Sequence, residues 1–303
     1  MKKVLVILGP TASGKSDLGV RLAKKFKGEI ISADSRQVYK GLNVGSGKIT
    51  RKEMRGVKHY MLDVLEPQKY FSVAQYQTLA QASLDHVLNN GKLPMIVGGT
   101  GFYIDALAGG IVLPEVPPNP KLRAKLARKS NTALFKMLRE LDPKRAKNID
   151  PQNKVRLIRA LEIVEKLGKV PPLRQGFAGQ APNKFVWIGL LPEDLDQRIE
   201  KRLTKRMPSM IREARKLLKQ KKLTYKRMHE LGLEYRYLAL YLQGKLDKLE
   251  MFNKLNTEIR RYSKRQMTWF RYNKKIKWYT LSSVEGFKPS QYKEIEKYLK
   301  SKL

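Results

Sequence analysis

Short apolar runs alternate with amphipathic stretches in the N-terminal third of the chain. Three of the runs are typical of buried strands, namely KKVLVIL (2–8), EIISA (29–33) and LPMIVGG (93–99). A helix is predicted from Ser16 to Gly28, because apolar residues recur there at the spacing of one helical face, and another over 72–89. This alternation of strands and helices predicts a mainly parallel sheet with helices on both faces.

The pattern changes at two proline-rich segments, LPEVPPNP (113–120) and KVPPLRQGFAGQAPN (169–183). The stretch between them reads as basic helices without a convincing strand. Strand character returns in FVWIGLL (185–191) and IKWYTL (276–281), and the residues between these two runs read as basic helices, the first kinked or split by Pro208. We therefore predict an α/β fold with a core formed by 1–117 and 184–303 and an inserted, all-helical domain over 118–183.

The charge balance points to a partner. Lys and Arg number 63 and Asp and Glu number 27, which gives a net charge of +36. A folded chain with this excess repels itself unless a polyanion lies nearby, so nucleic acid is the partner that we predict. A generally lysine-rich proteome and an acidic membrane surface are the two alternatives.

Cysteine content and run length exclude other classes of protein. The sequence has no cysteine, which excludes disulfides, thiolate metal sites and cysteine nucleophiles. No apolar run approaches the length of a membrane span, and the initial VLVIL is too short for a secretory signal. We therefore expect a cytoplasmic protein that does not associate with membranes.

The segment GPTASGKS (9–16) has the spacing of a phosphate-binding loop, with two glycines followed by Lys and Ser. It lies between a predicted strand and a predicted helix, which is the context that this motif requires. Its backbone N–H groups form an anion nest at a helix N-terminus. Lys15 supplies a point charge to a phosphate, and Ser16 can bind Mg²⁺.

A carboxylate is missing from the expected place near this loop. Proteins of this fold that hydrolyse nucleotides usually have an Asp at the end of an apolar strand, but here PMIV runs into GGTG. Asp63 is a weaker candidate inside a short segment. Asp34 follows the second predicted strand, and fold-level analogy places it nearest the loop. It could hold Mg²⁺, remove a proton from a nucleophile, or cap the following turn.

Three further groups of residues are candidates for chemistry. Ser35, Arg36, Gln37 and Tyr39 form a set that can recognise a base edge. GGTGFY (98–103) offers a flexible backbone, a hydroxyl and two aromatic rings, which either line a flat pocket or belong to the core. RRYSKRQMTWFRYNKK (260–275) mixes basic and aromatic residues, as in sites that stack unpaired bases, and also fits an amphipathic helix. The three histidines, His59, His86 and His229, have no metal-binding spacing and are expected to be structural.

Five motifs together resemble one family. GPTASGKS, SADSRQVYKGLNVGSGK, VGGTGFY, NKVRLIRALEI and KRQMTWFR occur in the order and spacing of bacterial tRNA dimethylallyltransferases, over residues 4 to about 279. The resemblance implies a P-loop NTPase-like core with a helical insertion that grips the anticodon stem. It implies transfer of a dimethylallyl group from dimethylallyl diphosphate to N6 of the adenine 3′-adjacent to the anticodon, in tRNAs that read codons starting with U. Mg²⁺ is the implied cofactor, and we expect a monomer.

The resemblance also implies roles for individual residues. Asp34 is the expected base, and Lys15 and a Ser16-bound Mg²⁺ stabilise the leaving diphosphate. Arg236 is expected to complete the diphosphate site, with Arg227 as the alternative. The diphosphate-binding residues are Gly9, Pro10, Thr11, Ala12, Ser13, Gly14, Lys15 and Ser16. The tRNA-binding residues are Asp34, Ser35, Arg36, Gln37, Thr100, Arg123, Arg156, Arg159, Lys264, Arg265 and Gln266.

Two other functions use some of the same features. A nucleotide-kinase-like phosphotransferase shares the loop and the sheet and would bind ATP, but it does not explain the net charge of +36 or the basic aromatic segment. A non-catalytic RNA-binding protein that retains a P-loop explains the charge but leaves Asp34 without a role. The zinc finger of eukaryotic relatives is excluded by the absence of cysteine.

Overall fold

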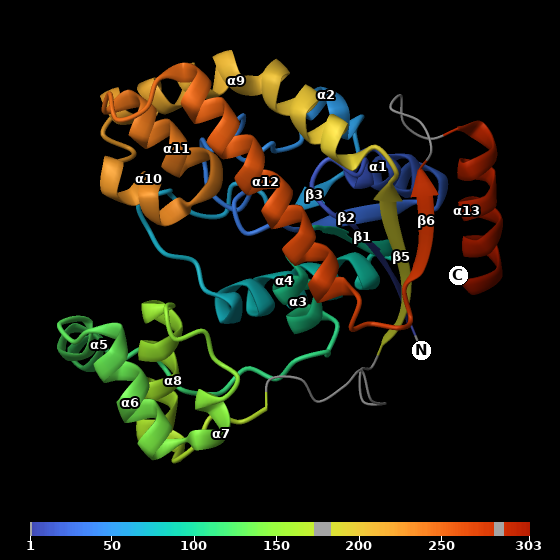
Figure 1. The fold of residues 1–303 in the computed structure, drawn as a ribbon. Helices are drawn as coiled ribbons and strands as arrows, with labels where there is room; N and C mark the ends of the chain where they lie inside the picture. The colour runs from blue at the N-terminus through green and yellow to red at the C-terminus, as the bar shows by residue number, and fades with distance from the viewer. Residues whose placement is uncertain (1, 173–182, 282–287) are drawn as a thin grey trace. The chain divides into compact units, whose positions relative to one another are not determined.

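A computed structural model describes residues 2–172, 183–281 and 288–303 (Figure 1). Its sheet consists of β1 (Lys2–Leu8), β2 (Gly28–Ala33), β3 (His59–Tyr60), β4 (Leu93–Gly98), β5 (Asn183–Pro192) and β6 (Lys277–Leu281). The strand order is β3-β2-β4-β1-β5-β6, and every pairing recorded among the described residues is parallel. The predicted α/β fold with a parallel sheet is confirmed. Among the strands of the described residues, the two-residue β3, which has no apolar run, is the one that was not predicted.

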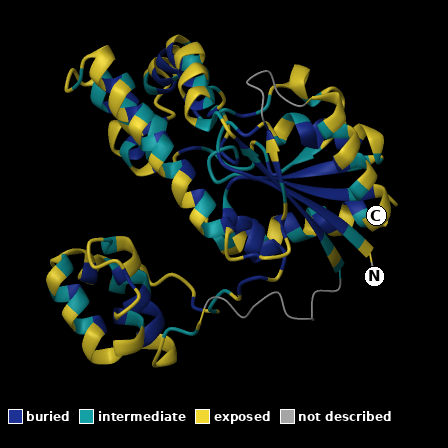
Figure 2. Ribbon diagram, turned by 45° about the vertical axis from the view of Figure 1, so that its right-hand side comes forward, coloured by how far each residue is buried: buried dark blue, intermediate teal, exposed yellow. Residues whose placement is uncertain are grey.

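Helices cover the sheet because the strands are apolar on both faces. Leu5 and Ile7 of β1 share a core with α1 (Lys15–Lys25) and α13 (Pro289–Lys302). Val4 and Val6, also fully buried, point to the opposite face. Helices α3 (Val73–Asn89) and α4 (Gly101–Leu107) lie against β2 and β4. Figure 2 shows the central parts of the strands buried, with exposed residues on the outer sides of the helices.

Helices α9 (Leu195–Lys219), α10 (Tyr225–Leu231), α11 (Leu233–Leu242) and α12 (Lys248–Phe270) form a second core. Val38 and Leu42, from the segment that follows β2, are buried in this core, and the short α2 (Arg51–Met54) follows them along the chain. This packing attaches the segment after β2 to the helices. Pro208 does not split α9, which is one helix on both sides of the proline, because apolar side chains before and after it are buried in the same core. The predicted kink stays a prediction.

The chain divides into two compact units, one of residues 1–108 and 180–303 and one of Gly109–Gly179. The second unit contains α5 (Pro120–Ala127), α6 (Asn131–Leu141), α7 (Pro143–Ala146) and α8 (Lys154–Leu167), with a core of its own. It begins before the predicted residue 118, because the carbonyl of Val116 accepts a hydrogen bond from Arg159 of α8 at 2.9 Å. The second predicted border, 169–183, lies largely outside the described residues.

Two smaller differences concern element ends. Helix α1 ends at Lys25, and Gly28 instead begins β2. A Cβ atom at Gly28 would lie 2.8 Å from the carbonyl oxygen of Leu93, so this glycine allows β2 and β4 to approach. Within the described ranges, none of the helices combines the length and the apolar character needed to cross a lipid bilayer.

Candidate active site

The loop 9–16 connects β1 to α1, as predicted. Glycine is required at its two glycine positions for different physical reasons. A Cβ atom at Gly9 would lie 2.5 Å from the carbonyl oxygen of Leu190 and 2.8 Å from Oγ of Ser13. Gly14, at the N-cap of α1, has a φ of 82°, in the left-handed region that favours glycine. The backbone therefore curls tightly around the N-terminus of α1, which is the geometry that binds phosphate.

Lys15 lies against this loop, and its Nζ donates a hydrogen bond to the carbonyl of Pro10 at 2.9 Å. The pKa of Lys15 is lowered to about 8, first by burial and then by the nearby Arg202 cation. The carboxylate of Asp34 opposes both effects. The charge of Lys15 is therefore destabilised until an anion enters the site. Its electrostatic neighbours also show that the loop, Asp34 and Arg202 share one small region.

Arg202 of α9 is the arginine at the loop. Its guanidinium donates to Oγ1 of Thr11 at 3.5 Å and to the carbonyl of Gly47 at 3.2 Å. Burial, followed by the neighbouring Arg206 cation, lowers the pKa of Arg202 to about 10. An arginine in this position can face an anion held by the loop.

The two arginines that we predicted for this role lie elsewhere. Arg236 is exposed on α11, and its Nε donates to the carbonyl of His229 at 3.4 Å. Arg227 is buried and donates to the carbonyl of Pro67 at 2.7 Å. The predicted roles of Arg236 and Arg227 stay predictions, and the structure adds Arg202 as a candidate at the loop. The sequence could not reveal Arg202, because α9 carries many basic residues and only the tertiary packing determines which of them faces the loop.

Asp34 lies at the carboxyl end of β2, on the same sheet edge as the loop. Its Oδ1 accepts hydrogen bonds from the backbone N–H groups of Arg36 at 2.8 Å and Gln37 at 3.3 Å, so it does cap the following turn. Among the described residues, no hydrogen bond is found to its Oδ2. Asp34 thus has one oxygen fixed by the backbone and another that can act as a base.

Asp34 lines a small cavity together with Lys15, Ser16, Gln37 and His59. The cavity measures about 30 Å³, which is the space of roughly one water molecule. Ser16 and Asp34 offer oxygen ligands there, the type that Mg²⁺ prefers. The described ranges contain no cluster of three or more acidic or histidine side chains that could hold a metal. The residues therefore suit a Mg²⁺ ion that takes most of its ligands from phosphates and water.

His59 was expected to be structural, and it is one of the residues that line this cavity. Its Nδ1 lies 2.9 Å from the carbonyl oxygen of Val57. Burial lowers the pKa of His59, and the hydrogen bond to Val57 opposes that effect. A neutral imidazole adds no positive charge to the site, so Lys15 and Arg202 remain its cations.

The glycines of GGTG are needed for close packing rather than for flexibility. A Cβ atom at Gly98 would lie 2.2 Å from the carbonyl oxygen of Ala33, and one at Gly101 would lie 2.1 Å from the ring of Trp269. Between them, Oγ1 of Thr100 accepts the backbone N–H of Ser35 at 3.1 Å. The turn after β4 is thereby attached to both β2 and α12, and Thr100 supports the backbone next to Asp34.

Gln266 of α12 links two parts of the site. Its Oε1 accepts the N–H of Thr11 at 2.9 Å, and its Nε2 donates to the carbonyl of Gly99 at 2.8 Å. The side chain is buried. Its amide supports the phosphate loop, because it is engaged at both ends within the chain, and its predicted contact with tRNA stays a prediction.

The rest of the basic aromatic segment forms the end of α12, so the amphipathic-helix interpretation is confirmed for its helical part. Phe270 is buried, and Nε1 of Trp269 donates to Asp105 at 2.8 Å. Lys264 and Arg265 are exposed. Burial raises the pKa of Tyr262, and the charge of Asp34 raises it further. The second effect indicates that Tyr262 lies near Asp34. The helix thus presents basic residues to solvent and Tyr262 towards Asp34.

Arg36 and Gln37 contact neighbouring loops. Nε of Arg36 donates to the carbonyl of Leu231 at 2.6 Å, and Nε2 of Gln37 donates to the carbonyl of Gly47 at 3.4 Å. Both side chains are partly exposed. Their predicted contacts with tRNA stay predictions.

In the second unit, a buried carboxylate organises the predicted arginines. Glu162 of α8 accepts a bidentate pair of hydrogen bonds from Arg123, at 2.8 and 2.7 Å, and another from Arg159. Burial alone would raise the pKa of Glu162, but the hydrogen bonds from Arg123, the backbone of Asn119 and Arg159 lower it to about 2. Arg156 is exposed, so it is the freest of the three predicted arginines to meet RNA.

We expect Glu162→Gln to destabilise this unit by about 2 kcal/mol at pH 7, since it leaves two arginines without their buried partner. In the wild type this contribution is present above pH 4.5 and is lost as the pH falls towards 2, because folding lowers the pKa of Glu162. Hydrogen exchange of the α8 amides measures the effect. Glu165→Gln, at an exposed position of the same helix, should change exchange little.

Comparisons with known proteins agree with one another. The family model described as IPP transferase matches residues 37–273. A protein of Thermoanaerobacter named tRNA dimethylallyltransferase is 38% identical over 314 residues, covering 99% of this chain and 98% of its own. One of Anoxybacillus flavithermus with the same name is 37% identical and covers 99% and 97%.

Solved structures show the same similarity. The full-length tRNA isopentenylpyrophosphate transferase of Bacillus halodurans has a TM-score of 0.74 and 34% identity, covering 100% of this chain and 97% of its own. A eukaryotic dimethylallyltransferase, crystallised while acting on tRNA, has a TM-score of 0.79 at 24% identity, covering 99% and 80%, and supports the fold alone.

Proposed function

This chain belongs to the IPP transferase family of tRNA-prenylating enzymes, and we propose that it transfers a dimethylallyl group from dimethylallyl diphosphate to an adenine. The acceptor is N6 of the adenine 3′-adjacent to the anticodon, in tRNAs that read codons starting with U. The product is N6-isopentenyladenosine. One observation carries the chemistry: Asp34 and the phosphate-loop residues Lys15 and Ser16 line the same cavity.

The diphosphate end of the donor fits the loop. As the bond between the allylic carbon and oxygen breaks, its electron pair leaves with the diphosphate, and negative charge grows there. The N–H groups of the loop, Lys15 and Arg202 are placed to stabilise that charge. Ser16 would hold a Mg²⁺ ion, which when bound neutralises part of the charge on the diphosphate.

The adenine end fits Asp34. An exocyclic amino group is a weak nucleophile, because its lone pair is delocalised into the ring. As N6 forms its bond to the allylic carbon, the N6 proton passes to the carboxylate of Asp34. Oδ1 accepts two backbone N–H groups, so Oδ2 is the oxygen placed to take the proton. The adenine must leave its stack to reach this position.

The partners that we propose follow from the same chemistry. We propose that the anticodon stem-loop contacts the exposed Lys264 and Arg265 of the first unit, and separately the exposed Arg156 of the second unit. The net charge of +36 supports a polyanionic partner. We propose that the protein acts as a monomer in the cytoplasm.

One assay tests the function. The protein is incubated with Mg²⁺, labelled dimethylallyl diphosphate and unmodified tRNA that has consecutive adenines 3′ of the anticodon. We expect label on the adenine next to the anticodon and none when that base is replaced by guanine. ATP hydrolysis without labelled tRNA would overturn the proposal in favour of a phosphotransferase. Adding ATP to the working reaction shows whether it competes for the loop.

Arg202 gives a second test, with Arg236 as the alternative. We expect Arg202→Ala to lower kcat/KM for dimethylallyl diphosphate by about 10²-fold, because a guanidinium that faces the leaving group is lost. Arg236→Ala, which removes an exposed arginine on α11, should stay within about twofold of the wild type. Steady-state kinetics with varied diphosphate at saturating tRNA compare the two. If the larger loss occurs in Arg236→Ala, the original assignment stands.

A further inference from the structure

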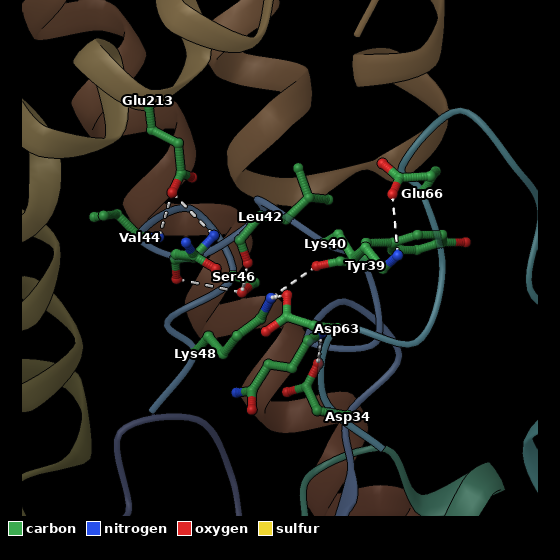
Figure 3. A network of polar contacts seen from close by, with 12 residues as sticks. Asp34, Tyr39, Lys40, Leu42, Val44, Ser46, Lys48, Asp63, Glu66 and Glu213 are labelled. Atoms are coloured by element: carbon green, nitrogen blue, oxygen red, sulfur yellow. Dashed lines mark hydrogen bonds and ion pairs between the residues drawn. The ribbon is translucent and has the colours of Figure 1, made fainter. Parts of the chain in front are cut away.

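A second nest of backbone N–H groups lies in the loop 43–48, and a side chain of the protein fills it. Oε2 of Glu213, on α9, accepts the N–H groups of Asn43 at 2.9 Å and Val44 at 2.7 Å, and Oε1 accepts that of Gly45 at 2.9 Å (Figure 3). Three successive N–H groups that point at one carboxylate form the arrangement that binds anions in other proteins. Here the anion is supplied by the chain itself.

Tyr235 of α11 completes this carboxylate site. Its hydroxyl donates to Oε1 of Glu213 at 2.8 Å, and its ring is almost fully buried. A Cβ atom at Gly45 would lie 2.5 Å from that hydroxyl, so glycine is required where the loop meets Tyr235. Four donors therefore converge on one carboxylate, which fixes the loop against two helices.

Two arginines of α9 also hold this loop, through its carbonyl groups. Arg206 donates to the carbonyl of Val44 at 3.0 Å and to that of Gly45 at 2.9 Å. Arg202, one helical turn earlier, donates to the carbonyl of Gly47 at 3.2 Å. Gly47 has a φ of 62°, and a Cβ atom there would lie 2.3 Å from the Arg202 guanidinium.

Arg202 is also the connection to the phosphate loop. The guanidinium that donates to Gly47 donates to Thr11 through its other terminal nitrogen. Next to Gly47 in the chain, Nζ of the buried Lys48 donates to the carbonyl of Tyr39 at 2.7 Å and pairs with Asp63 (Figure 3). Gly47 is thus flanked by a residue that is itself fixed, and its carbonyl is one of the two acceptors of the Arg202 guanidinium.

We propose that Glu213 is a positioning residue, which holds the loop 43–48 so that the carbonyl of Gly47 directs Arg202 towards the diphosphate. This inference rests on the proposed function for the role of Arg202. Removing the carboxylate leaves three N–H groups and the Tyr235 hydroxyl without their acceptor, so the loop loosens while the rest of the core remains. Arg202 then loses its fixed acceptor, and its charge is no longer held over the phosphate loop.

The experiment is a double-mutant cycle of Glu213→Ala and Arg202→Ala. We expect Glu213→Ala to raise KM for dimethylallyl diphosphate by about tenfold, with KM for tRNA changed less than about twofold. In the Arg202→Ala background, Glu213→Ala should add less than about twofold, because its effect passes through Arg202. Glu200→Ala on the same helix is the matched control, since Glu200 pairs with Arg260 at an exposed position and does not contact the loop.

Fully additive losses in the double variant would overturn the inference, as would an equal rise in KM for tRNA. If Glu213→Ala folds poorly, Glu213→Gln replaces it, because glutamine keeps the shape of the side chain and removes only the carboxylate. Hydrogen exchange at the amides of Asn43, Val44 and Gly45 gives a measurement that needs no substrate, and unchanged exchange would equally contradict the inference. If the wild type transfers no prenyl group while exchange rises in Glu213→Ala, the proposed function fails and the loop contact stands.

Discussion

Asp34→Asn is expected to slow prenyl transfer by at least about 10³-fold while tRNA affinity stays within about twofold of the wild type. Asparagine has the same shape as aspartate, and its carbonyl oxygen can still accept the N–H groups of Arg36 and Gln37. The turn after β2 therefore keeps its cap. What is lost is the carboxylate oxygen that takes the N6 proton as the new bond forms.

Two measurements separate the roles of Asp34. Single-turnover transfer with saturating dimethylallyl diphosphate reports the chemical step, and equilibrium binding of tRNA reports recognition. Asp34→Ala should lose the same activity and also loosen the turn, because it removes the cap. Asp17→Asn, on the exposed side of α1, is the matched control. If Asp34→Asn lost tRNA affinity and rate to the same degree, Asp34 would be chiefly a recognition residue.

Asp34 could be identified from the sequence because of simple sheet geometry. The apolar runs gave the strands, and the carboxyl ends of parallel strands meet at one edge of a sheet. A carboxylate directly after β2 and a phosphate loop directly after β1 must therefore lie on the same edge. The order of the strands, with β4 between β1 and β2, was not needed for that conclusion.

Residues that reach the site from distant helices could not be chosen in this way. Arg202 is one of many basic residues on α9, and nothing local distinguishes it from Arg206 or Lys205. The internal contacts of Gln266 were not predicted, because it stands in a basic run. Its helical spacing places it with the buried Ile259, Ser263 and Phe270, on the inner face of α12.

The glycines after β4 show the same limit. The segment GGTG was predicted to be flexible, because glycine permits many backbone conformations. In the structure, Gly98 and Gly101 are required by contacts with Ala33 and Trp269. The second of these partners lies far away in the sequence. At Gly101, a side chain is excluded by the packing of α12 against this turn.

Lys15→Met is expected to abolish most of the transfer activity and, without substrate, to make the protein more stable by about 2 kcal/mol at pH 7. Burial lowers the pKa of Lys15 to about 8, so holding its charge in the folded state opposes folding. Methionine has a similar length and no charge. The hydrogen bond from Nζ to Pro10, worth about 1 kcal/mol, is the main stabilising contact that the change removes.

The pH dependence of the free energy of unfolding tests whether the buried charge of Lys15 causes this difference. Between pH 8 and 10.5 the unfolded wild type binds more protons at Lys15 than the folded protein, so wild-type stability rises with pH over that window. The advantage of Lys15→Met should therefore be largest below pH 8 and shrink towards pH 10.5, as urea unfolding of both proteins at several pH values would measure. Lys24→Met, at an exposed position of α1, should differ from the wild type by less than about 0.5 kcal/mol throughout.

Diphosphate should reverse the difference between wild type and Lys15→Met. An anion in the loop favours the charged lysine, so saturating diphosphate should stabilise the wild type and have much less effect on Lys15→Met. A variant less stable than the wild type at pH 7 in the absence of any anion would contradict this account. Such a result would mean that the charge of Lys15 is already balanced within the chain, with Asp34 as the nearest candidate. The expected result instead describes a loop whose charge is held at a cost in stability, which the leaving diphosphate then offsets.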